Sequence, residues 1–314
     1  MYIHLMEMSD TPEKALVAAA HLCHLVPDGV HMNHILTHLD VLVGDYRRSI
    51  DCNYEETISD DKSLHCAGGK NFYSFYRFHN YHSLIYAAML LGQYQVALAS
   101  TGRMEATITE GLLRINSPPM VNWMEFFKSV LVHVLIRFGF WDELKKLSIP
   151  EDRELYCRKG VAWAATGNVT EADKERELFR EAANRMPPTH LDFPNKVVDK
   201  LKVAALMLDV EIEYRRGNFK VAFARLRNAA YEDDHHLYSE PWGWMLPARH
   251  PYAALLLEQG HMEEAAHIHA KDLGLNYNLV RRHQHPNNVG SLSGYHECLM
   301  RLGRTAEANI IQRS

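Results

Sequence analysis

The chain has 314 residues, of which 47% are hydrophobic and 23% are charged, as expected for a folded globular protein with a large core. Its formal net charge is −5, and its basic residues are interspersed with acidic ones. This charge pattern excludes the basic surface that nucleic acids and anionic membranes require, so we expect neither as a partner.

The cysteines and the N-terminus bear on the cellular compartment. The five cysteines are far apart in the sequence and form no C-x-x-C pair, which is typical of reduced thiols rather than of disulfides or a zinc site. The N-terminal residues lack a basic segment followed by an apolar one, and no stretch approaches about 18 apolar residues. We therefore expect a cytoplasmic protein without a signal peptide or membrane span.

A glycine that separates two helical segments recurs along the chain, as in "MLLGQYQVAL" (89–98) and "LEQGHMEEAA" (257–266). Each glycine is predicted to end one helix in the left-handed conformation and to allow the next helix to begin. The glycines are Gly44, Gly92, Gly139, Gly167, Gly217, Gly260 and Gly303. No alternation of period two predicts a strand, so the fold class is all-α, an α-solenoid of helix pairs over residues 1–314.

Four segments rich in glycine, proline or polar residues interrupt the helical pattern and are predicted to be irregular connections. They are residues 59–71, 115–122, 185–195 and 232–251.

Histidines recur at helical spacing in the first three helices that face the predicted groove. The first helix contains His4 and Glu7, three residues apart. The segment "VHMNHILTHLD" (30–40) contains His31, His34 and His38, which the helical repeat places on one face.

The next such helix contains a second H-x-x-H pair, His79 and His82 in "FHNYHSL" (78–84). Counted back from their turn glycines, the two H-x-x-H pairs occupy the same positions. Because adjacent packed helices lie roughly 8–10 Å apart, the imidazoles are predicted to point into one space.

A cluster of imidazoles is typical of sites for zinc, copper, iron or nickel. A carboxylate such as that of Glu7 among the histidines favours non-haem iron, whereas ligation by histidines alone favours copper or zinc. The alternative is that the histidines only line a polar groove without holding an ion.

The connection 232–251 combines acidic, aromatic and basic side chains in a long loop, which often marks function. Arg249 is predicted to orient an anionic group of a substrate, and Trp242 and Trp244 to supply apolar walls. The alternative is a packed surface loop. The residues predicted to contact a substrate are Tyr238, Glu240, Trp242, Arg249, His250 and His296.

Several of these segments together resemble a family of tetratricopeptide-repeat (TPR) proteins of bacteria and fungi. The segments are "YIHLMEMSDTPEKAL" (2–16), "HMNHILTHLDVLVGDYRRSI" (31–50), "FHNYHSLIYAAMLLGQY" (78–94), "YSEPWGWMLPARHPYAALLLEQGHMEEA" (238–265) and "HPNNVGSLSGYHECLMRLGRTAEA" (285–308). The resemblance implies a single TPR-like α-solenoid domain with extended loops. Members usually have more chain upstream of the position of Met1, so it also implies a preceding N-terminal part.

The family's motifs fall on identifiable positions of this chain. Its H-x-x-H-M-P-[ST]-H segment falls on His31, His34 and His38, its H-x-x-[HD] helix on His79 and His82, and its Y-x-E-P loop on Tyr238, Glu240 and Pro241. Two departures stand out. Ile35 and Leu36 replace the family's Met-Pro, and Gly290 and Ser293 stand where a tryptophan and often a histidine occur.

The pattern as a whole predicts a metal-dependent enzyme, a copper or non-haem iron oxidoreductase acting on a small organic substrate in the groove. The predicted metal ligands and their neighbours are His34, His38, His79, His82, His31, His4 and Glu7. Two alternatives remain open. One is a scaffold that binds a peptide or protein partner without catalysis, and the other is a zinc ion held for structure alone.

Overall fold

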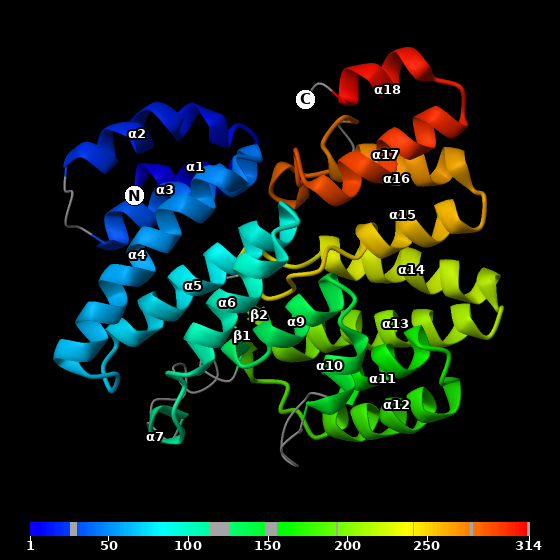
Figure 1. Cartoon of the computed structure of the whole chain (residues 1–314), viewed down its shortest axis with the longest axis horizontal. Helices are drawn as coiled ribbons and strands as arrows, with labels where there is room; N and C mark the ends of the chain where they lie inside the picture. The colour runs from blue at the N-terminus through cyan, green and yellow to red at the C-terminus, as the bar shows by residue number, and fades with distance from the viewer. Residues whose placement is uncertain are drawn as a thin grey trace. The chain divides into compact units, whose positions relative to one another are not determined.

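The computed structural model describes residues 1–25, 30–113, 126–147, 156–192, 194–240, 242–276 and 279–312. These residues are mostly helical (Figure 1). The α-helices are α1 (Tyr2–Glu7), α2 (Leu16–Leu25), α3 (Val30–Val43), α4 (Tyr46–Ala67), α5 (Tyr73–Leu90), α6 (Tyr94–Glu105), α7 (Glu110–Leu113), α9 (Val130–Arg137), α10 (Trp141–Lys146), α11 (Tyr156–Ala165), α12 (Val169–Asn184), α13 (Val197–Arg215), α14 (Phe219–Asp234), α15 (Arg249–Glu258), α16 (Met262–Asp272), α17 (Val289–Arg301) and α18 (Thr305–Ile311). Two short 3₁₀ helices span Pro12–Ala15 and Arg281–His283. The prediction of an all-α fold is confirmed.

The prediction of no strand is wrong at one place. Strands β1 (Leu191–Asp192) and β2 (Asn195–Lys196) pair antiparallel, with Leu191 opposite Lys196. Two-residue strands are too short to show an alternation of period two in the sequence. Except for Lys196, their residues lie within the segment 185–195, which the sequence predicts to be irregular.

The prediction of an irregular segment over residues 59–71 is also wrong for most of its length. Helix α4 continues to Ala67 and ends at Gly68, whose φ is 71°. The polar residues that suggested a loop face a neighbouring helix instead. The carboxylate of Asp60, which is fully buried, accepts hydrogen bonds from the hydroxyl of Tyr73 at 2.7 Å and from Nδ2 of Asn80 at 2.7 Å.

The seven turn glycines behave as predicted. Each has a positive φ and separates two consecutive helices, from α3 and α4 at Gly44 to α17 and α18 at Gly303. Residues with a Cβ atom adopt this left-handed conformation only at a cost, which is why glycine recurs at these positions.

The chain divides into two compact units. The first unit comprises Met1–Lys128, Glu240–Trp242 and Ala253–Ser314, and the second comprises Ser129–Ser239 and Gly243–Tyr252. The expectation of one solenoid domain over residues 1–314 stays a prediction.

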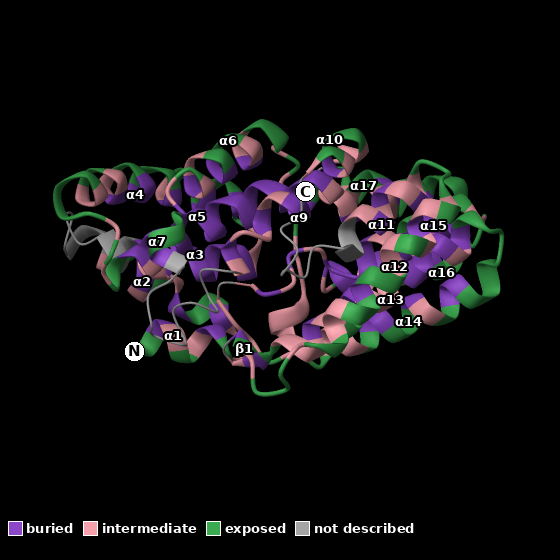
Figure 2. Cartoon of the chain, turned by 90° about the horizontal axis from the view of Figure 1, so that it is seen from below, coloured by how far each residue is buried: buried purple, intermediate pink, exposed green. Residues whose placement is uncertain are grey.

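In the first unit, helix α5 is buried along nearly its whole length, from Ser74 to Leu90 (Figure 2). Helix α3 packs against α5, and α1 packs against α3. An apolar cluster that includes Ile3, Leu36 and Leu39 joins α1 to α3. This packing places polar side chains of all three helices, such as Glu7, His38 and His79, in the interior, where they require hydrogen-bonding or ionic partners.

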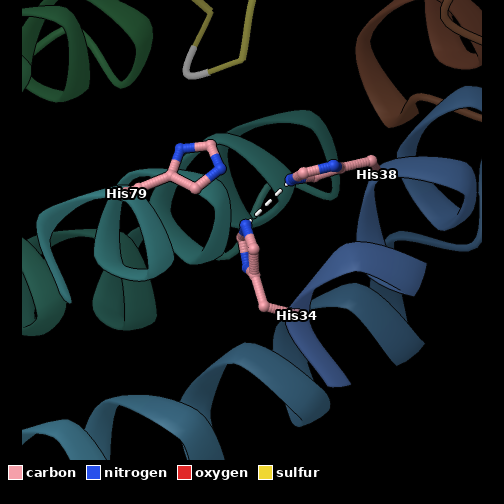
Figure 3. Close-up of side chains that lie close together, drawn as sticks. All are labelled: His34, His38 and His79. Atoms are coloured by element: carbon pink, nitrogen blue, oxygen red, sulfur yellow. Dashed lines mark hydrogen bonds between the residues drawn. The ribbon is translucent and has the colours of Figure 1, made fainter. Parts of the chain in front are cut away.

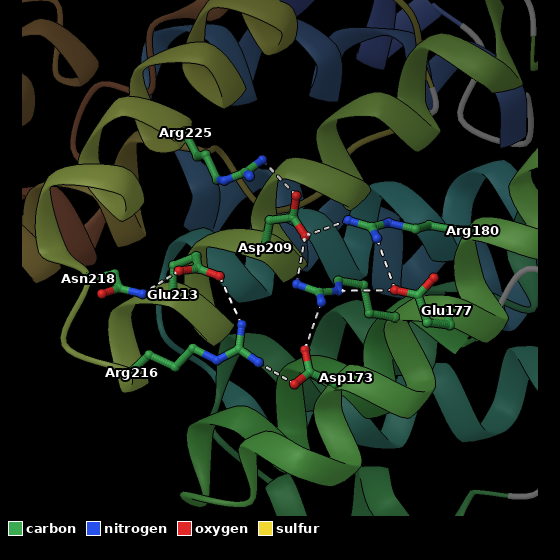
Figure 4. A network of polar contacts seen from close by, with 9 residues as sticks. Asp173, Glu177, Arg180, Asp209, Glu213, Arg216, Asn218 and Arg225 are labelled. Carbon is green, nitrogen blue, oxygen red and sulfur yellow. Dashed lines mark hydrogen bonds and ion pairs between the residues drawn. The ribbon is translucent and has the colours of Figure 1, made fainter.

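In the second unit, α11, α12 and α13 share an apolar cluster that includes Phe179, Leu208 and Ile212. A network of ion pairs joins α12, α13 and α14 (Figure 4). At its centre, Asp209 accepts a hydrogen bond from Nη1 of Arg225 at 2.7 Å, and the guanidinium of Arg180 lies 3.5 Å from it. Because most of these groups are partly exposed, their contribution to stability is modest.

Within the described part of the chain, no helix has both the length and the apolar character needed to cross a membrane.

The turn glycines allow a test of the local backbone. A Cβ atom at Gly44 would clash with the backbone carbonyl of Pro286, whereas a Cβ atom at Gly303 would meet nothing within 4 Å. We expect Gly303→Ala to lower the free energy of unfolding by about 1 kcal/mol, the cost of the left-handed conformation alone. We expect Gly44→Ala to lower it by roughly 1–3 kcal/mol more, because the backbone of Pro286 must move. Urea unfolding of both variants checks the difference, and equal losses would contradict the structure around Gly44.

Candidate metal centre

Three buried histidines from two helices converge in the first unit (Figure 3). His34 and His38 lie one turn apart on α3, and His79 lies on α5. One nitrogen atom from each ring lies within 4.8 Å of the others. The Nε2 atoms of His34 and His38 are 2.8 Å apart. We call these three residues the histidine triad.

A hydrogen bond to Asn53 of α4 determines which ring nitrogen of His34 carries the proton. Its Nδ2 donates to the backbone carbonyl of Ser49 at 2.8 Å and to the hydroxyl of Thr37 at 3.1 Å. These bonds orient the amide so that Oδ1 faces the His34 ring, where it accepts from Nδ1–H at 2.7 Å. With its proton on Nδ1, the neutral His34 ring presents the lone pair of Nε2 to the triad.

The other nitrogen of His38 faces two carboxylates. Its Nδ1 atom forms a close ion pair with Oε2 of Glu240 and lies 3.4 Å from Oε1 of Glu7. Nδ1 of His4 lies 3.3 Å from a carboxylate oxygen of each glutamate. His4, Glu7, His38 and Glu240 also place one ligand atom each within 4.8 Å of one another. We call them the mixed quartet.

The electrostatics of the mixed quartet follow from this geometry. Burial lowers the pKa of His38, but the charges of Glu240 and Glu7 outweigh burial and raise that pKa to about 10. Hydrogen bonds to Glu240 and Glu7 raise the pKa of His4 to about 9. Burial raises the pKa of Glu7, but the charge of His38 outweighs it and lowers that pKa to about 2. Without a metal ion, protons on the two imidazoles therefore balance the carboxylate charge.

Aromatic packing positions His79. Its ring stacks parallel to Phe75, with centroids 6.3 Å apart and an angle of 4° between the planes. The same ring meets His34 edge to face at 4.4 Å. Both contacts restrict the His79 ring to the orientation that brings it to the triad.

His82, predicted as a ligand, belongs to neither the triad nor the mixed quartet. Its buried ring lies beside Trp242 at 6.4 Å and Phe126 at 5.4 Å. Three residues along an α-helix correspond to about 300° of rotation and 4.5 Å of rise, so His82 is displaced from His79 both around and along α5. The side chain of His31 lies outside the described residues.

The long loop contributes two residues to the first unit. Glu240, predicted to contact a substrate, instead lies in the mixed quartet. Trp242 stacks on Tyr86 with centroids 4.4 Å apart and presents its ring edge-on to His38 at 6.4 Å. The prediction that Trp242 forms an apolar wall of a substrate site stays a prediction. Pro241 lies outside the described residues.

The other predicted substrate residues belong to neither the triad nor the mixed quartet. The guanidinium of Arg249 is buried and paired with Asp234, so the expectation that it binds an anionic substrate lacks support. His250 lies 3.1 Å from Nη1 of Arg137 in the second unit. Tyr238 follows α14 in the second unit, and His296 is half-buried on α17.

The site includes a residue that sequence reasoning missed. Asn53 is 19 positions from His34, and no repeat or motif connects the two residues. Their contact depends on the packing of α4 against α3. The carboxylate of Glu240 was singled out, but its contact with His38 depends on the course of a loop that carries no periodic signal.

Comparison of the chain with protein-family models and with curated proteins gave no match. The resemblance to the TPR family therefore stays a prediction.

The mixed quartet predicts a pH dependence of stability in metal-free protein. Because the folded state raises the pKa of His38 from 6.5 to about 10, protonated His38 stabilises the fold. This contribution is complete below pH 6.5 and is lost as the pH rises through about 10. We expect the free energy of unfolding to fall over this range. In Glu240→Gln the decline should be smaller and should end at lower pH, because a carboxylate that raises the folded-state pKa of His38 is gone.

Urea unfolding across this range with a chelator present checks the expectation. Glu297→Gln, which changes a half-exposed carboxylate of α17 that is paired with Arg301, is the matched control. A wild-type pH profile in Glu240→Gln would contradict the proposed charge balance.

Proposed function

We propose that the histidine triad binds a redox-active transition metal ion and that the protein is a metal-dependent oxidoreductase acting on a small organic substrate. The observation that carries the proposal is the convergence of three buried nitrogen ligands within 4.8 Å. The orientation of His34 by Asn53 supports it, since ligand histidines usually bind a polar partner through their second nitrogen.

A metal ion accounts for the polar groups that the fold buries at this place. Burying imidazoles in contact is unfavourable unless each lone pair finds a proton or a cation. The Nε2 lone pair of His34 faces Nε2 of His38 at 2.8 Å. In the metal-free protein a proton on His38 can bridge them, and in the metal-bound protein both nitrogens can ligate the ion.

The two nitrogens of His38 face different groups, and either of them can ligate the metal ion. This gives two modes of metal binding. In the first mode, the triad holds the ion, and Nδ1–H of His38 donates to Glu240 and Glu7. This gives the carboxylate–histidine–metal arrangement common in metalloproteins. In the second mode, the mixed quartet holds the ion, and Nε2–H of His38 donates to His34. We favour the first mode, because it uses His79 as a ligand, whereas in the second mode His79 only packs beside His34 and His38.

The ligand set bears on the metal. Three histidines with an open fourth position suit copper or zinc, and two histidines with carboxylates suit non-haem iron. Copper and iron change oxidation state and support oxidoreductase chemistry, whereas zinc would supply hydrolytic or structural roles. Three nitrogen ligands leave a coordination position for a substrate or an oxidant, and Trp242 supplies an apolar surface beside His38.

The helix pairs support a TPR-like solenoid as the scaffold. Seven left-handed glycines each separate two consecutive helices, as the sequence pattern predicted. In such a solenoid, adjacent helix pairs stack and present equivalent faces of their first helices to one surface. A solenoid of this kind would account for the convergence of His34 and His38 of α3 with His79 of α5.

Metal analysis of purified variants tests the proposal and separates the two modes. Protein prepared without a histidine tag and loaded with Cu²⁺ or Fe²⁺ should retain about one ion per chain after desalting, as a single set of ligands implies. His34→Ala and His79→Ala should retain almost none, because each loses one of three ligands. Glu240→Gln should still bind, with affinity lower by about 10–100-fold, since it loses only a partner of His38.

His267→Ala, which removes an exposed histidine of α16, is the matched control and should bind like the wild type. The opposite pattern, with Glu240→Gln empty and His79→Ala loaded, would assign the ion to the mixed quartet. Wild-type protein that retains no ion would overturn the proposal. A stoichiometric protein partner on such metal-free protein would then favour the interaction scaffold.

Tryptophan fluorescence gives an independent test of the position of the ion. Because Trp242 lies edge-on to His38 at 6.4 Å, a paramagnetic Cu²⁺ ion in the triad should quench its emission. Titration with Cu²⁺ should therefore lower the fluorescence of the wild type, with a smaller loss in Trp242→Phe. In Trp163→Phe, which changes a residue beside the apolar cluster of the second unit, the loss should match the wild type. Equal quenching in Trp242→Phe and wild type would place the ion elsewhere.

A further inference from the structure

We propose that Tyr86 is a redox-active tyrosine that passes an electron to the metal ion of the triad and its proton to His285. The proposal rests on the proposed function for its electron acceptor. The hydrogen-bonded arrangement of Tyr86, His285 and Asp272, all in the first unit, is independent of any metal.

A buried carboxylate orients His285. Asp272 is fully buried, and its Oδ1 accepts a hydrogen bond from Nδ1–H of His285 at 2.8 Å. Its Oδ2 accepts from the hydroxyl of Ser291 at 2.7 Å and from Nδ2 of Asn288 at 2.9 Å. The backbone N–H of His285 also donates to the carbonyl of Asp272 at 2.7 Å. The ring is thus held with its proton on Nδ1 and its lone pair on Nε2.

That lone pair faces a phenol. The hydroxyl of Tyr86 lies 3.1 Å from Nε2 of His285, so Tyr86 donates and His285 accepts. Tyr86 lies on α5, only 1% exposed. The carboxylate of Asp272 fixes the orientation of the ring, so that Nε2 of His285 is the atom placed to take the proton of Tyr86.

Trp242 connects Tyr86 to the triad. The indole stacks on the Tyr86 ring, with centroids 4.4 Å apart and 15° between the planes, and lies perpendicular to the ring of His38, with centroids 6.4 Å apart. The indole of Trp242 and the imidazole of His38 therefore form a path of aromatic rings from the phenol to the triad. Aromatic rings at successive centroid separations of 4.4 and 6.4 Å support electron transfer between the phenol and the triad.

One electron and one proton leave Tyr86 in this step. The phenol of Tyr86 gives one electron to the oxidised metal ion, which is reduced by one unit of charge. The O–H bond of Tyr86 breaks, and its proton forms a bond to Nε2 of His285. The products are a neutral tyrosyl radical, an imidazolium paired with Asp272, and the reduced ion. Coupling the two transfers avoids the strongly acidic radical cation that a phenol forms when it loses an electron alone.

Tyr81, another buried tyrosine of α5, lacks these features. Its hydroxyl donates to Oδ2 of Asp61 at 2.9 Å, and a carboxylate in an ion pair is a weaker base than imidazole. The guanidinium groups of Arg77 and Arg103 lie 5.1 and 5.3 Å from the centre of its ring. These cations raise the cost of removing an electron from Tyr81, which makes it a matched control.

The first experiment oxidises metal-free protein with a photo-excited ruthenium tris-bipyridine complex and persulfate and detects radicals by electron paramagnetic resonance. We expect a tyrosyl radical in the wild type, a several-fold lower yield in Tyr86→Phe, and a wild-type yield in Tyr81→Phe. His285→Gln should also lose yield several-fold, because glutamine can accept the hydrogen bond but cannot take the proton. Tyr86→Phe keeps the ring that stacks on Trp242, and circular dichroism checks that each variant folds.

An undiminished yield in Tyr86→Phe would overturn the proposal, and an undiminished yield in His285→Gln would overturn the role of His285. The second experiment loads the reduced ion, Cu⁺. The Tyr86 radical should then decay faster in the wild type but not in His79→Ala, and an unchanged decay in loaded wild-type protein would overturn the coupling. A failure of the proposed function would show separately, as absence of metal by elemental analysis.

Discussion

The burial of His38 between two sets of polar groups is the constraint on which the organisation of the first unit depends. Its Nε2 faces another imidazole and its Nδ1 faces two carboxylates, with the ring almost inaccessible to water. An arrangement of this kind is costly unless protons or a cation complete it. The surrounding structure supplies the partners: α1 contributes Glu7, α5 contributes His79, and the long loop contributes Glu240.

This arrangement gives the loop at residues 240–242 a physical role. Glu240 completes the charge balance around His38, while Trp242 fixes the same segment by stacking on Tyr86. An ionic contact and an aromatic contact two residues apart hold the loop more tightly than either does alone. The carboxylate of Glu240 therefore supplies negative charge next to His38, and the indole of Trp242 supplies an aromatic surface next to the same ring.

The aromatic and polar contacts of α5 extend this centre along the helix. His79, His82 and Tyr86 follow one another on α5 at spacings of three and four residues, and Trp242 contacts the rings of His82 and Tyr86. Tyr86 then reaches His285 and the buried Asp272. The interior of the first unit thus contains a continuous series of rings and hydrogen bonds rather than an apolar core alone, which is unusual for a helix buried on all sides.

Local signals in the sequence determined the all-α fold, the turn glycines and the shared face of His34 and His38. The reason is that helical periodicity and the left-handed glycine depend on neighbouring residues alone. Tertiary packing decided the rest. It brought His79, and not His82, to His34 and His38. The rotation of α5 about its own axis relative to α3 depends on how the helices pack and not on the spacing of residues within either helix. It brought Asn53 to His34, placed Glu240 beside His38 and paired Arg249 with Asp234, since contacts between distant segments follow from how whole helices and loops pack.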